Sequence, residues 1–208
     1  GLVDFPASLL LIGQMLSTGT APAGVPQLIW NPDQATSLFG AGSIAEDMVK
    51  TALLASPTTM VTAIGVADAV SATKATCNLV VTGTQTAAGT IALYISGIRV
   101  AIPVGAGDAL ATIQASIAAA VASANQGPRT LPVTVAAGTI ATNTLTVPIT
   151  ARHGGLVGNE IDVRFNLLPG DAFPPGLTVT ATAMASGATN PSIAASITAI
   201  AAEWYTDI

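Results

Sequence analysis

Hydrophobic and polar positions follow two different patterns along the chain. The first 68 residues carry an apolar run at 8–15 (SLLLIGQM), two stretches with helical spacing, and a second apolar run at 60–68 (MVTAIGVAD). Short apolar runs between breaking residues predict strands, and apolar residues that recur every three or four positions predict helices. This part of the chain therefore predicts the order strand-helix-helix-strand, which is typical of a piece of an α/β domain.

The two predicted helices have recognisable start and stop signals. In NPDQATSLFG, Asp33 is placed to act as the N-cap and Gly40 to end the helix. In SIAEDMVKTALLASP, Ser43 and Glu46 have the spacing of a capping box, and Pro57 ends the run. The apolar face of this second helix is predicted to consist of Ile44, Met48, Ala52 and Ala55.

After Asp68 the pattern changes to short β-branched runs separated by Gly, Asn or Pro, which predict strands. The runs are NLVVTG, TIALYISG, IRVAIPV, LPVTVAAG, TLTVPIT, DVRFNLL and LTVTATAMA. One helix interrupts them, in GDALATIQASIAAAVASANQG, where Asp108 is placed to cap. Its apolar stripe consists of Leu110, Ile113, Ile117 and Val121. This stripe predicts a helix that lies across one face of a sheet.

The hexapeptide AAGTIA occurs at 87–92 and again at 136–141. Duplicated hairpins would produce such a repeat, and so would two turns built from the same small residues. Turns that contain glycine reuse the same composition, which favours the second interpretation.

The last residues return to the pattern of the first 68. A helix is predicted at 190–203, with Asn190 as N-cap and Pro191 at the first helical position. Its apolar face is predicted to consist of Ile193, Ile197 and Ile200. The EWYTDI segment that follows has the character of a further α/β strand.

These patterns together predict an α+β protein. Residues 1–69 are predicted to form the first part of an α/β core domain, and residues 187–208 to return to it. Between them, residues 70–186 are predicted to be an inserted, β-rich domain that carries one helix.

Charge is scarce in this chain. Half of the 208 residues are hydrophobic and 8% are charged, against roughly 25% in an ordinary globular domain. A surface with so little charge is weakly protected against association, which favours a subunit of a larger assembly over an isolated enzyme. The six Lys and Arg residues form no basic stripe and the net charge is −5, so we expect no nucleic-acid partner.

The mean hydropathy of +0.65 raises the question of membrane insertion. Gly13 and Gln14 break the first apolar run, and Gln and Ser residues break the Ala-rich segment 109–124. No run reaches the ~20 apolar residues of a spanning helix, so we expect no membrane partner. Cys77 is the only cysteine, which excludes a disulfide within the chain.

The segment GAGSIA at 40–45 matches a G-x-G-x-x-A dinucleotide-binding pattern, with Asp68 downstream. That pattern needs a strand directly before its first glycine, so that the turn presents its amides to the pyrophosphate. Here the preceding QATSLF predicts a helix. Gly40 and Gly42 are therefore predicted to form a turn between two helices.

The segment VGAGDA at 104–109 resembles the G-A-G-D signature of ribokinase-like sugar kinases. The resemblance implies that Asp108 is the base and that Gly105 and Gly107 form an anion hole at a helix N-terminus. The following LATIQ lacks the further small residues and Gly of that signature, and no sugar-binding glycine pair is recognisable upstream. We favour a capping Asp after a glycine turn.

Other polar residues offer weaker chemistry. His153 is the only histidine, and ARHGGLVGNE has no nucleophile elbow, which favours a solvated or hydrogen-bonded loop side chain. One Cys and one His cannot build a zinc site, and Glu160 with Asp162 matches no calcium loop. The remaining acidic pairs are interpreted as helix-terminal or surface charges: Glu46 with Asp47, and Glu203 with Asp207. We predict no catalytic, cofactor-binding or metal-binding residues.

Several stretches taken together resemble the contractile-tail sheath proteins of Mu-like bacteriophages. They are LLLIGQML, LFGAGSIAEDMV, GTIALYISGIRVAIPV, ITARHGGLVGNEIDVRFN, and MASGATNPSI with EWYTDI. They occur in the family's order and span nearly the whole chain. The resemblance implies a domain inserted into an α/β sheath core and a mechanical role without enzymatic activity or cofactor.

The resemblance also implies a longer protein. In the family, EWYTDI lies where the chain returns to the core domain, a long C-terminal portion follows it, and an N-terminal arm precedes LLLIGQ. We therefore expect these 208 residues to be a fragment. The missing parts would include the arms that link neighbouring subunits by strand exchange.

The partners that the resemblance implies are other sheath subunits in a helical homo-oligomer, the tail tube and the baseplate, with no nucleic acid and no membrane. Subunits would assemble in the cytoplasm of the bacterial host and become part of the virion, with the inserted domain facing outward. Two alternatives stay open. One is a β-rich carbohydrate- or surface-binding module, although only two Trp and two Tyr are available as sugar platforms. The other is a ribokinase-like sugar kinase.

Overall fold

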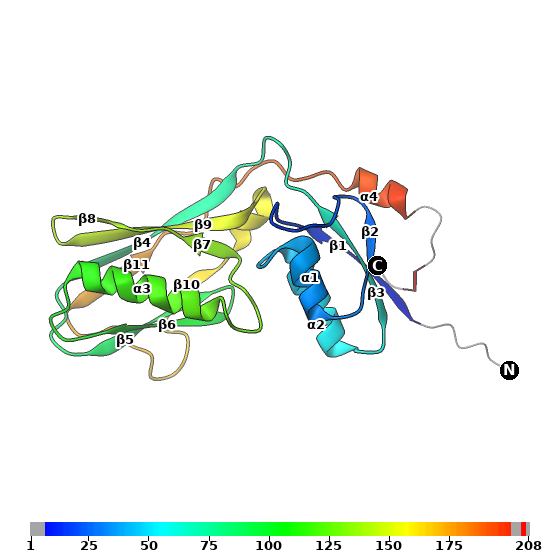
Figure 1. Ribbon diagram of the computed structural model, residues 1–208. Coiled ribbons are helices and arrows are strands. Elements are labelled where there is room, and N and C mark those ends of the chain that lie inside the picture. Colours follow the sequence, from blue (N-terminus) through cyan, green and yellow to red (C-terminus); the bar gives the residue numbers. More distant parts are fainter. Residues whose placement is uncertain (1–6, 201–204, 207–208) are drawn as a thin grey trace. The chain divides into compact units, whose positions relative to one another are not determined.

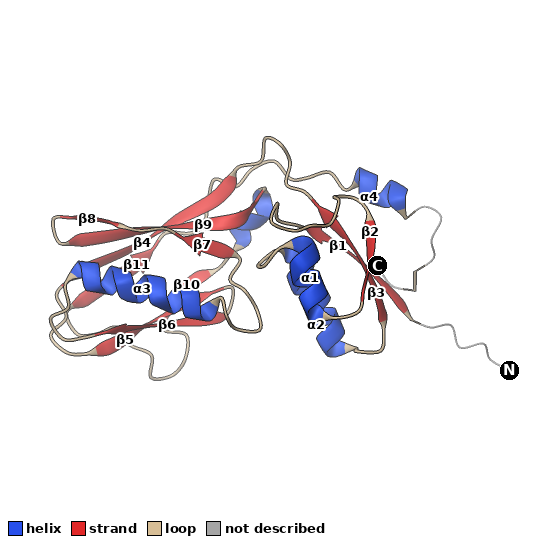
Figure 2. Ribbon diagram, in the orientation of Figure 1, coloured by secondary structure: helices blue, strands red, loops and turns tan. Residues whose placement is uncertain are grey.

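The computed structural model describes residues 7–200 and 205–206 (Figure 1). Contacts divide the chain into two compact units. Unit 1 combines residues 1–72 with residues 189–208, and unit 2 consists of residues 73–188. Helices and sheets are both present (Figure 2), which confirms the predicted α+β class.

Unit 1 is built on a three-stranded sheet with the strand order β1-β3-β2. Strands β1 (Ser8–Gln14) and β3 (Met60–Val66) are parallel, and they confirm the two strands predicted at 8–15 and 60–68. Strand β2 (Pro26–Ile29) pairs antiparallel with β3 and was not predicted. Its four residues PQLI follow a stretch rich in Pro and Gly, and Pro is tolerated there because β2 is an edge strand.

Helices α1 (Pro32–Phe39) and α2 (Ile44–Ala55) confirm the two predicted helices. The prediction of Asp33 as N-cap is wrong. The N-cap is Asn31, whose backbone is extended at φ −151° and whose Oδ1 accepts a hydrogen bond from Gln34 N at 2.8 Å. Pro32 occupies the first helical position, where its missing N–H costs nothing, so the cap is Asn31, two residues before the predicted Asp33. Gly40 ends α1 as predicted, with φ 86°.

The buried face of α2 differs from the predicted one. The buried apolar residues are Ala45, Val49 and Leu53, whereas the predicted Ile44, Met48 and Ala52 are half-buried and Ala55 is exposed. The observed set and the predicted set are both apolar and lie side by side along the helix. Helical periodicity alone therefore could not show which of the two sets is buried.

The two helices pack on one face of the sheet, because their buried residues share one hydrophobic cluster with alternate strand residues. The cluster consists of Met15, Ala21, Ile29, Ala35, Phe39, Ala45, Val49, Leu53, Val61 and Ala63.

Helix α4 (Ala194–Ala199) lies on the opposite side of this sheet from α1 and α2 (Figure 1). The prediction of Asn190 as N-cap and Pro191 as first helical residue is wrong, because α4 begins later, with Ile193 as an N-cap that lacks a side-chain hydrogen bond. Ile193 and Ile197 are exposed. Residues 201–203 of the predicted helix lie outside the described residues.

The described end of the chain lies beside the beginning of β1. Thr206 N donates to Ser8 O at 3.0 Å, and Ser8 N donates to the Thr206 hydroxyl at 2.7 Å. Trp204, Asp207 and Ile208 of the predicted strand EWYTDI lie outside the described residues. The Thr206–Ser8 contact joins the two separate chain segments that make up unit 1.

Unit 2 contains two antiparallel sheets. The first has the order β10-β5-β6, and its strands are β5 (Gly89–Ile95), β6 (Ile98–Val104) and β10 (Val163–Phe165). The second has the order β11-β4-β9-β7, with β8 paired to β9. Its strands are β4 (Lys74–Gly83), β7 (Val133–Val135), β8 (Thr139–Ala141), β9 (Thr144–Gly154) and β11 (Leu177–Ala181).

Every run that predicts a strand in this unit contains one. Buried and more exposed residues alternate along β4, β6, β9 and β11, whereas residues 91–95 of β5 form a continuous buried run. Strand β8 and the short 3₁₀ helix η1 (Leu156–Glu160) were not predicted. All three residues of β8 are exposed, so β8 has no alternation to detect.

Helix α3 (Leu110–Ala124) confirms the predicted helix of this unit. Ile113, Ile117 and Val121 are buried and Leu110 packs beside them, as the stripe predicted. The helix contacts β6 of one sheet and β9 of the other, so it closes one side of the core between the sheets (Figure 1). The prediction of Asp108 as its cap is wrong, because the N-cap residue is Ala109 and it makes no side-chain bond.

Each AAGTIA copy leads into the first strand of a hairpin, β5–β6 in one case and β8–β9 in the other. The hairpins differ in length and burial: Ile91 is buried in β5, and Ile140 is exposed in β8. The repeat therefore marks two hairpins with different surroundings.

Candidate functional site

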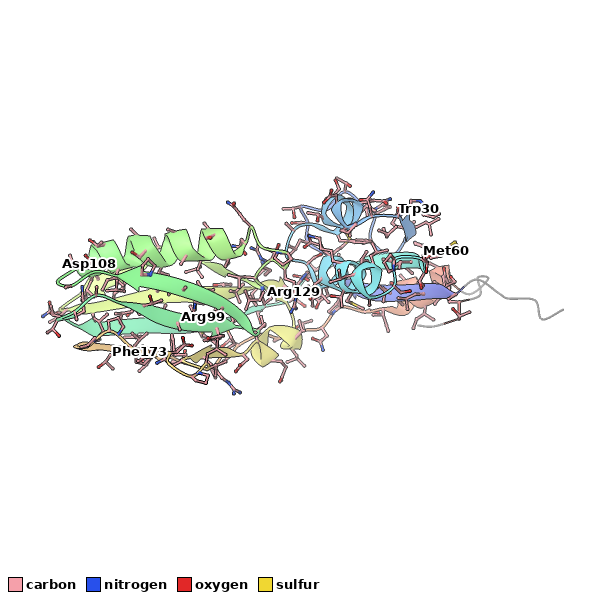
Figure 3. The ribbon with its side chains drawn as sticks, turned by 90° about the horizontal axis from the view of Figure 1, so that it is seen from below. Trp30, Met60, Arg99, Asp108, Arg129 and Phe173 are labelled. Carbon is pink, nitrogen blue, oxygen red and sulfur yellow. The ribbon has the colours of Figure 1, made fainter. Side chains whose placement is uncertain are left out.

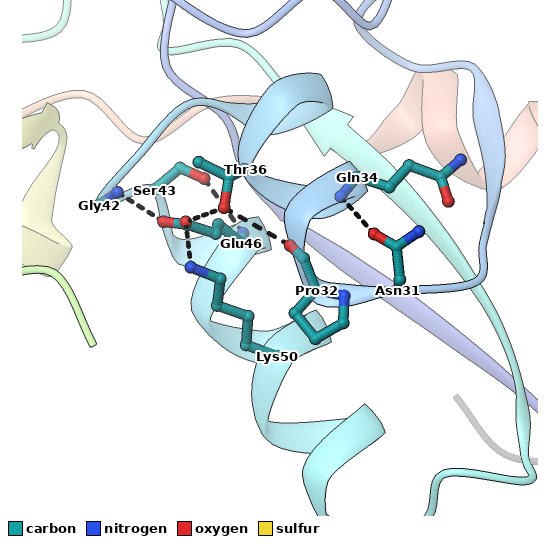
Figure 4. A network of polar contacts seen from close by, with 8 residues as sticks. All are labelled: Asn31, Pro32, Gln34, Thr36, Gly42, Ser43, Glu46 and Lys50. Carbon is teal, nitrogen blue, oxygen red and sulfur yellow. Dashed lines mark hydrogen bonds and ion pairs between the residues drawn. The ribbon is translucent and has the colours of Figure 1, made fainter. Parts of the chain in front are cut away.

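The most buried polar cluster lies at the turn between α1 and α2 (Figure 4). Glu46 is 2% exposed. Its Oε2 accepts a hydrogen bond from Gly42 N at 2.6 Å. Its Oε1 accepts one from the Thr36 hydroxyl at 2.6 Å and lies 2.7 Å from Lys50 Nζ. The carboxylate is therefore fully occupied by partners within unit 1.

The predicted capping box forms only in part. Ser43 is the N-cap of α2, and its hydroxyl accepts from Glu46 N at 3.1 Å. Glu46 does not return to the amide of Ser43, because that amide donates to Gly40 O at 3.1 Å. The carboxylate binds Gly42 N instead.

This geometry bears directly on the dinucleotide-like pattern. The element before Gly40 is helix α1, so the predicted turn between helices is confirmed. The Gly42 amide that would have to face a pyrophosphate is occupied by Glu46. Asp68 lies apart from this turn and accepts from Gln14 Nε2 at 2.9 Å.

In the turn at 104–109, which resembles the kinase signature, a carboxylate of the same unit also binds a glycine amide. The Asp108 carboxylate accepts from Gly105 N at 2.6 Å, and Gly107 N donates to Gln85 O at 3.1 Å. Gln85 Nε2 also donates to Asp108 O at 2.8 Å. Asp108 itself takes the position that an anion would need at this turn, which argues against its role as a base in phosphoryl transfer.

The prediction of His153 as a loop residue is wrong, because His153 lies in β9 and is 5% exposed. Asp162 pairs with Arg164 Nε at 2.7 Å, both exposed, and Glu160 ends η1. Burial raises the pKa of the Cys77 thiol, which disfavours the thiolate. Within residues 7–200 and 205–206, no three His, Cys, Asp or Glu side chains converge as metal ligands would.

One polar cluster was missed by sequence reasoning. The Tyr94 hydroxyl donates to Asp171 Oδ2 at 2.6 Å, Arg99 Nη2 donates to Asp171 Oδ1 at 3.0 Å, and Arg99 Nε donates to the Tyr94 hydroxyl at 3.2 Å. Leu168 N donates to Asp171 as well. The cluster ties the loop after β10 to strands β5 and β6, and no short-range signal could have found it, because Asp171 lies 77 residues from Tyr94 and 72 from Arg99.

The electrostatics of this cluster follow from its hydrogen bonds. The bond from Tyr94 lowers the pKa of Asp171, and the bond from Arg99 adds to this effect. Burial raises the pKa of Tyr94, and so does its bond to Asp171. The bond to Asp171 raises the pKa of Arg99. These shifts favour an ionised Asp171, a protonated Tyr94 and a charged Arg99 at neutral pH. The three side chains therefore form a structural clamp, which we call the clamp of unit 2.

A groove of about 210 Å³ runs between α3 and strands β7 and β9. Its lining is aliphatic except for Gln114, and it contains no aromatic side chain. Small-molecule sites are usually larger, at roughly 300–1,000 Å³, and contain several convergent polar groups. The groove therefore offers neither a sugar platform nor a set of catalytic groups.

Several large apolar side chains of unit 1 are exposed. Trp30 is 68% exposed directly after β2, and Met60, at the start of the neighbouring β3, is also exposed (Figure 3). Leu54 at the end of α2 is 85% exposed. Single exposed apolar side chains are common on protein surfaces, and only a large contiguous apolar patch would mark a contact with another macromolecule.

Comparison with known proteins supplies one relative. Over 197 residues, 95% of this chain, the sequence is 37% identical to the Mu-like prophage FluMu tail sheath protein of Haemophilus influenzae. The chain spans 39% of the length of that protein. The predicted relationship to the Mu-like tail sheath proteins is thereby confirmed. No family model matches the chain, and no helix in its described ranges has the length and apolar character of a membrane span.

Proposed function

We propose that this chain is part of the structural subunit of a bacteriophage contractile tail sheath. The subunit polymerises around the tail tube and contracts to drive the tube through the host envelope. The observation that carries the proposal is the 37% identity over 95% of the chain to a tail sheath protein.

The organisation of the chain supports it. Unit 1 combines the two ends of the chain, and Thr206 hydrogen-bonds Ser8 across 198 residues. Unit 2 is continuous from residue 73 to residue 188. A guest domain within a split host domain would have this arrangement, with residues 73–188 as the guest in the sheath core.

The chemistry of the polar groups also supports a structural role. Glu46, Asp108 and Asp171 are each bound by groups of their own unit. The exposed Trp30 suits packing against further subunits, since aromatic side chains are enriched at interfaces.

The partners of the subunit would be other copies of itself, the tail tube and the baseplate, within a virion that is assembled in the host cytoplasm. No cofactor, nucleic acid or membrane is part of the proposal. The free energy of contraction would be stored in the packing of the extended assembly, as in other transitions between two packed states.

Electron microscopy of the purified full-length protein tests this function. We expect tubular polymers with helical repeats. Absence of any tubular polymer across a range of salt, pH and protein concentration would contradict the proposal. Two controls address the alternatives: a glycan array, on which we expect no binding, and a sugar-phosphorylation assay with ATP, in which we expect no turnover.

A further inference from the structure

The two ends of unit 2 are bound to each other by backbone hydrogen bonds. Thr73 N donates to Ala188 O at 3.1 Å, and Ala188 N donates to Thr73 O at 3.2 Å. Thr76 and Ala185 form a second reciprocal pair, at 2.8 and 3.0 Å. Both pairs are isolated antiparallel bridges, and Thr76 of the second pair belongs to β4. The first and last residues of unit 2 are therefore direct neighbours.

A side chain from η1 reinforces this junction. Asn159 Nδ2 donates to Gly187 O at 3.0 Å, and Gly187 N donates to Asn159 Oδ1 at 2.8 Å. One side chain thus satisfies both backbone groups of Gly187 next to the bridge. The Thr73 hydroxyl donates to Ser186 O at 2.8 Å on the other side.

The backbone at this junction is tightly constrained. A Cβ at Gly187 would lie 2.4 Å from Gly155 O and 2.9 Å from Asn159 Oδ1, so only glycine permits this approach. Ser186 and Thr189 have φ values of 72° and 65°, in the left-handed region that non-glycine residues seldom adopt. Such conformations persist only where surrounding contacts hold them.

We propose that Thr73, Asn159, Gly187 and Ala188 form a clasp that holds the ends of unit 2 together and opens separately from the sheets behind it. Thr73 and Ala188 are exposed, whereas Ala75, two residues into the unit, is fully buried. Opening the clasp breaks its hydrogen bonds and uncovers only the buried Gly187 and the methyl group of Ala75 beside it, a small apolar area, which is the property of a local opening unit.

The clasp has a mechanical consequence. A force that separates the two ends of unit 2 acts first on the Thr73–Ala188 bridge, because this bridge lies where both chain segments leave the unit. The core strands β4 and β9 carry the load only after the clasp has opened. The inference rests on the geometry of unit 2 alone and holds whether or not the chain acts in a tail sheath.

Amide hydrogen exchange of the 208-residue chain, measured by NMR, tests the clasp. Asn159→Ala removes both side-chain bonds to Gly187 without touching the backbone bridge. We expect exchange at Thr73, Gly187 and Ala188 to become about tenfold faster or more, as the loss of two hydrogen bonds implies. Exchange in the centres of β4 and β9 should be unchanged.

Asn125→Ala is the matched control. Asn125 also accepts a hydrogen bond from a backbone amide, that of Leu131 at 3.0 Å, but it lies at the end of α3. This variant should accelerate exchange at Leu131 and leave the clasp amides unchanged.

Two results would overturn the proposal. Unchanged exchange at the clasp amides in the Asn159→Ala variant would show that the side chain does not hold the junction. Equal acceleration at the clasp and in the centres of β4 and β9, or complete unfolding of unit 2, would show that the clasp does not open separately. Neither result depends on polymerisation, so this test fails or succeeds independently of the electron microscopy.

Discussion

Replacement of Glu46 by alanine should destabilise unit 1 strongly. The side chain is 2% exposed, and its carboxylate binds the Gly42 amide, the Thr36 hydroxyl and the Lys50 ammonium group (Figure 4). The three partners respond differently to its loss. Lys50 is 26% exposed and can regain water, and the Thr36 hydroxyl keeps Pro32 O within 3.5 Å.

The Gly42 amide determines most of the expected cost, because its hydrogen bond to Glu46 is buried and no other acceptor is in place. A buried donor left without an acceptor costs about 1–3 kcal/mol. Breaking a buried charge pair by removing one partner costs about 3–5 kcal/mol in total, and the partial exposure of Lys50 places Glu46→Ala near the lower end of that range. Domain stabilities are about 5–15 kcal/mol, so the loss is a large fraction of the total.

Urea unfolding followed by tryptophan fluorescence measures this effect selectively, because Trp30 lies in unit 1 and residues 73–188 of unit 2 contain no tryptophan. Glu46→Gln should lie between the wild type and Glu46→Ala, since the amide oxygen can still accept from Gly42. Asp33→Ala is the control, because it removes an exposed carboxylate from the first turn of α1. If Glu46→Ala and Asp33→Ala lower the free energy of unfolding equally, the Glu46 network does not stabilise the turn between the helices.

Two further predictions concern the cap of α1 and the clamp of unit 2. Asn31→Ala should cost about 1 kcal/mol in the same urea assay and Asp33→Ala less than that, because Asn31 makes the capping bond; equal costs would contradict the assignment of the cap. The pKa of Asp171 is lowered in the folded protein, so its stabilising effect is present above the ordinary carboxyl pKa and is lost as pH falls through the lowered one. Thermal unfolding of unit 2, followed by circular dichroism between pH 2 and 7, should therefore show acid destabilisation in the wild type and a flatter profile in Asp171→Asn.

The elements with strong periodicity could be predicted from sequence, and those that depend on distant contacts could not. Helix α3 was predicted with its buried stripe because apolar residues recur at helical spacing for four turns. Strand β2 was missed because PQLI becomes a strand only through its pairing with β3. The predicted division into a core domain of residues 1–69 and 187–208 and an inserted domain of residues 70–186 stays a prediction.

The three wrong N-caps have one physical origin. Near each helix start the sequence contains a side chain that could cap, and the choice depends on where the backbone changes from extended to helical. At α1 that change occurs at Asn31, before Pro32, and not at Asp33. Before α3, the Asp108 carboxylate is bound to Gly105 N instead. Cap-forming residues therefore predict that a helix begins nearby, but not which side chain closes its first turn.

The candidate chemistry fails for a related reason. A short motif records which residue types are adjacent, whereas a site needs donors and acceptors that remain available to a ligand. Gly42 and Gly105 have the identity that an anion site requires, but carboxylates of the same unit already bind their amides. With 8% charged residues, this chain uses buried or half-buried carboxylates to fasten turns and loops, and it leaves apolar side chains such as Trp30 exposed. Because the Gly42 and Gly105 amides are already bound within their own units, neither turn is available to a small charged substrate, and the proposed mechanical role rests instead on the 37% identity to a tail sheath protein.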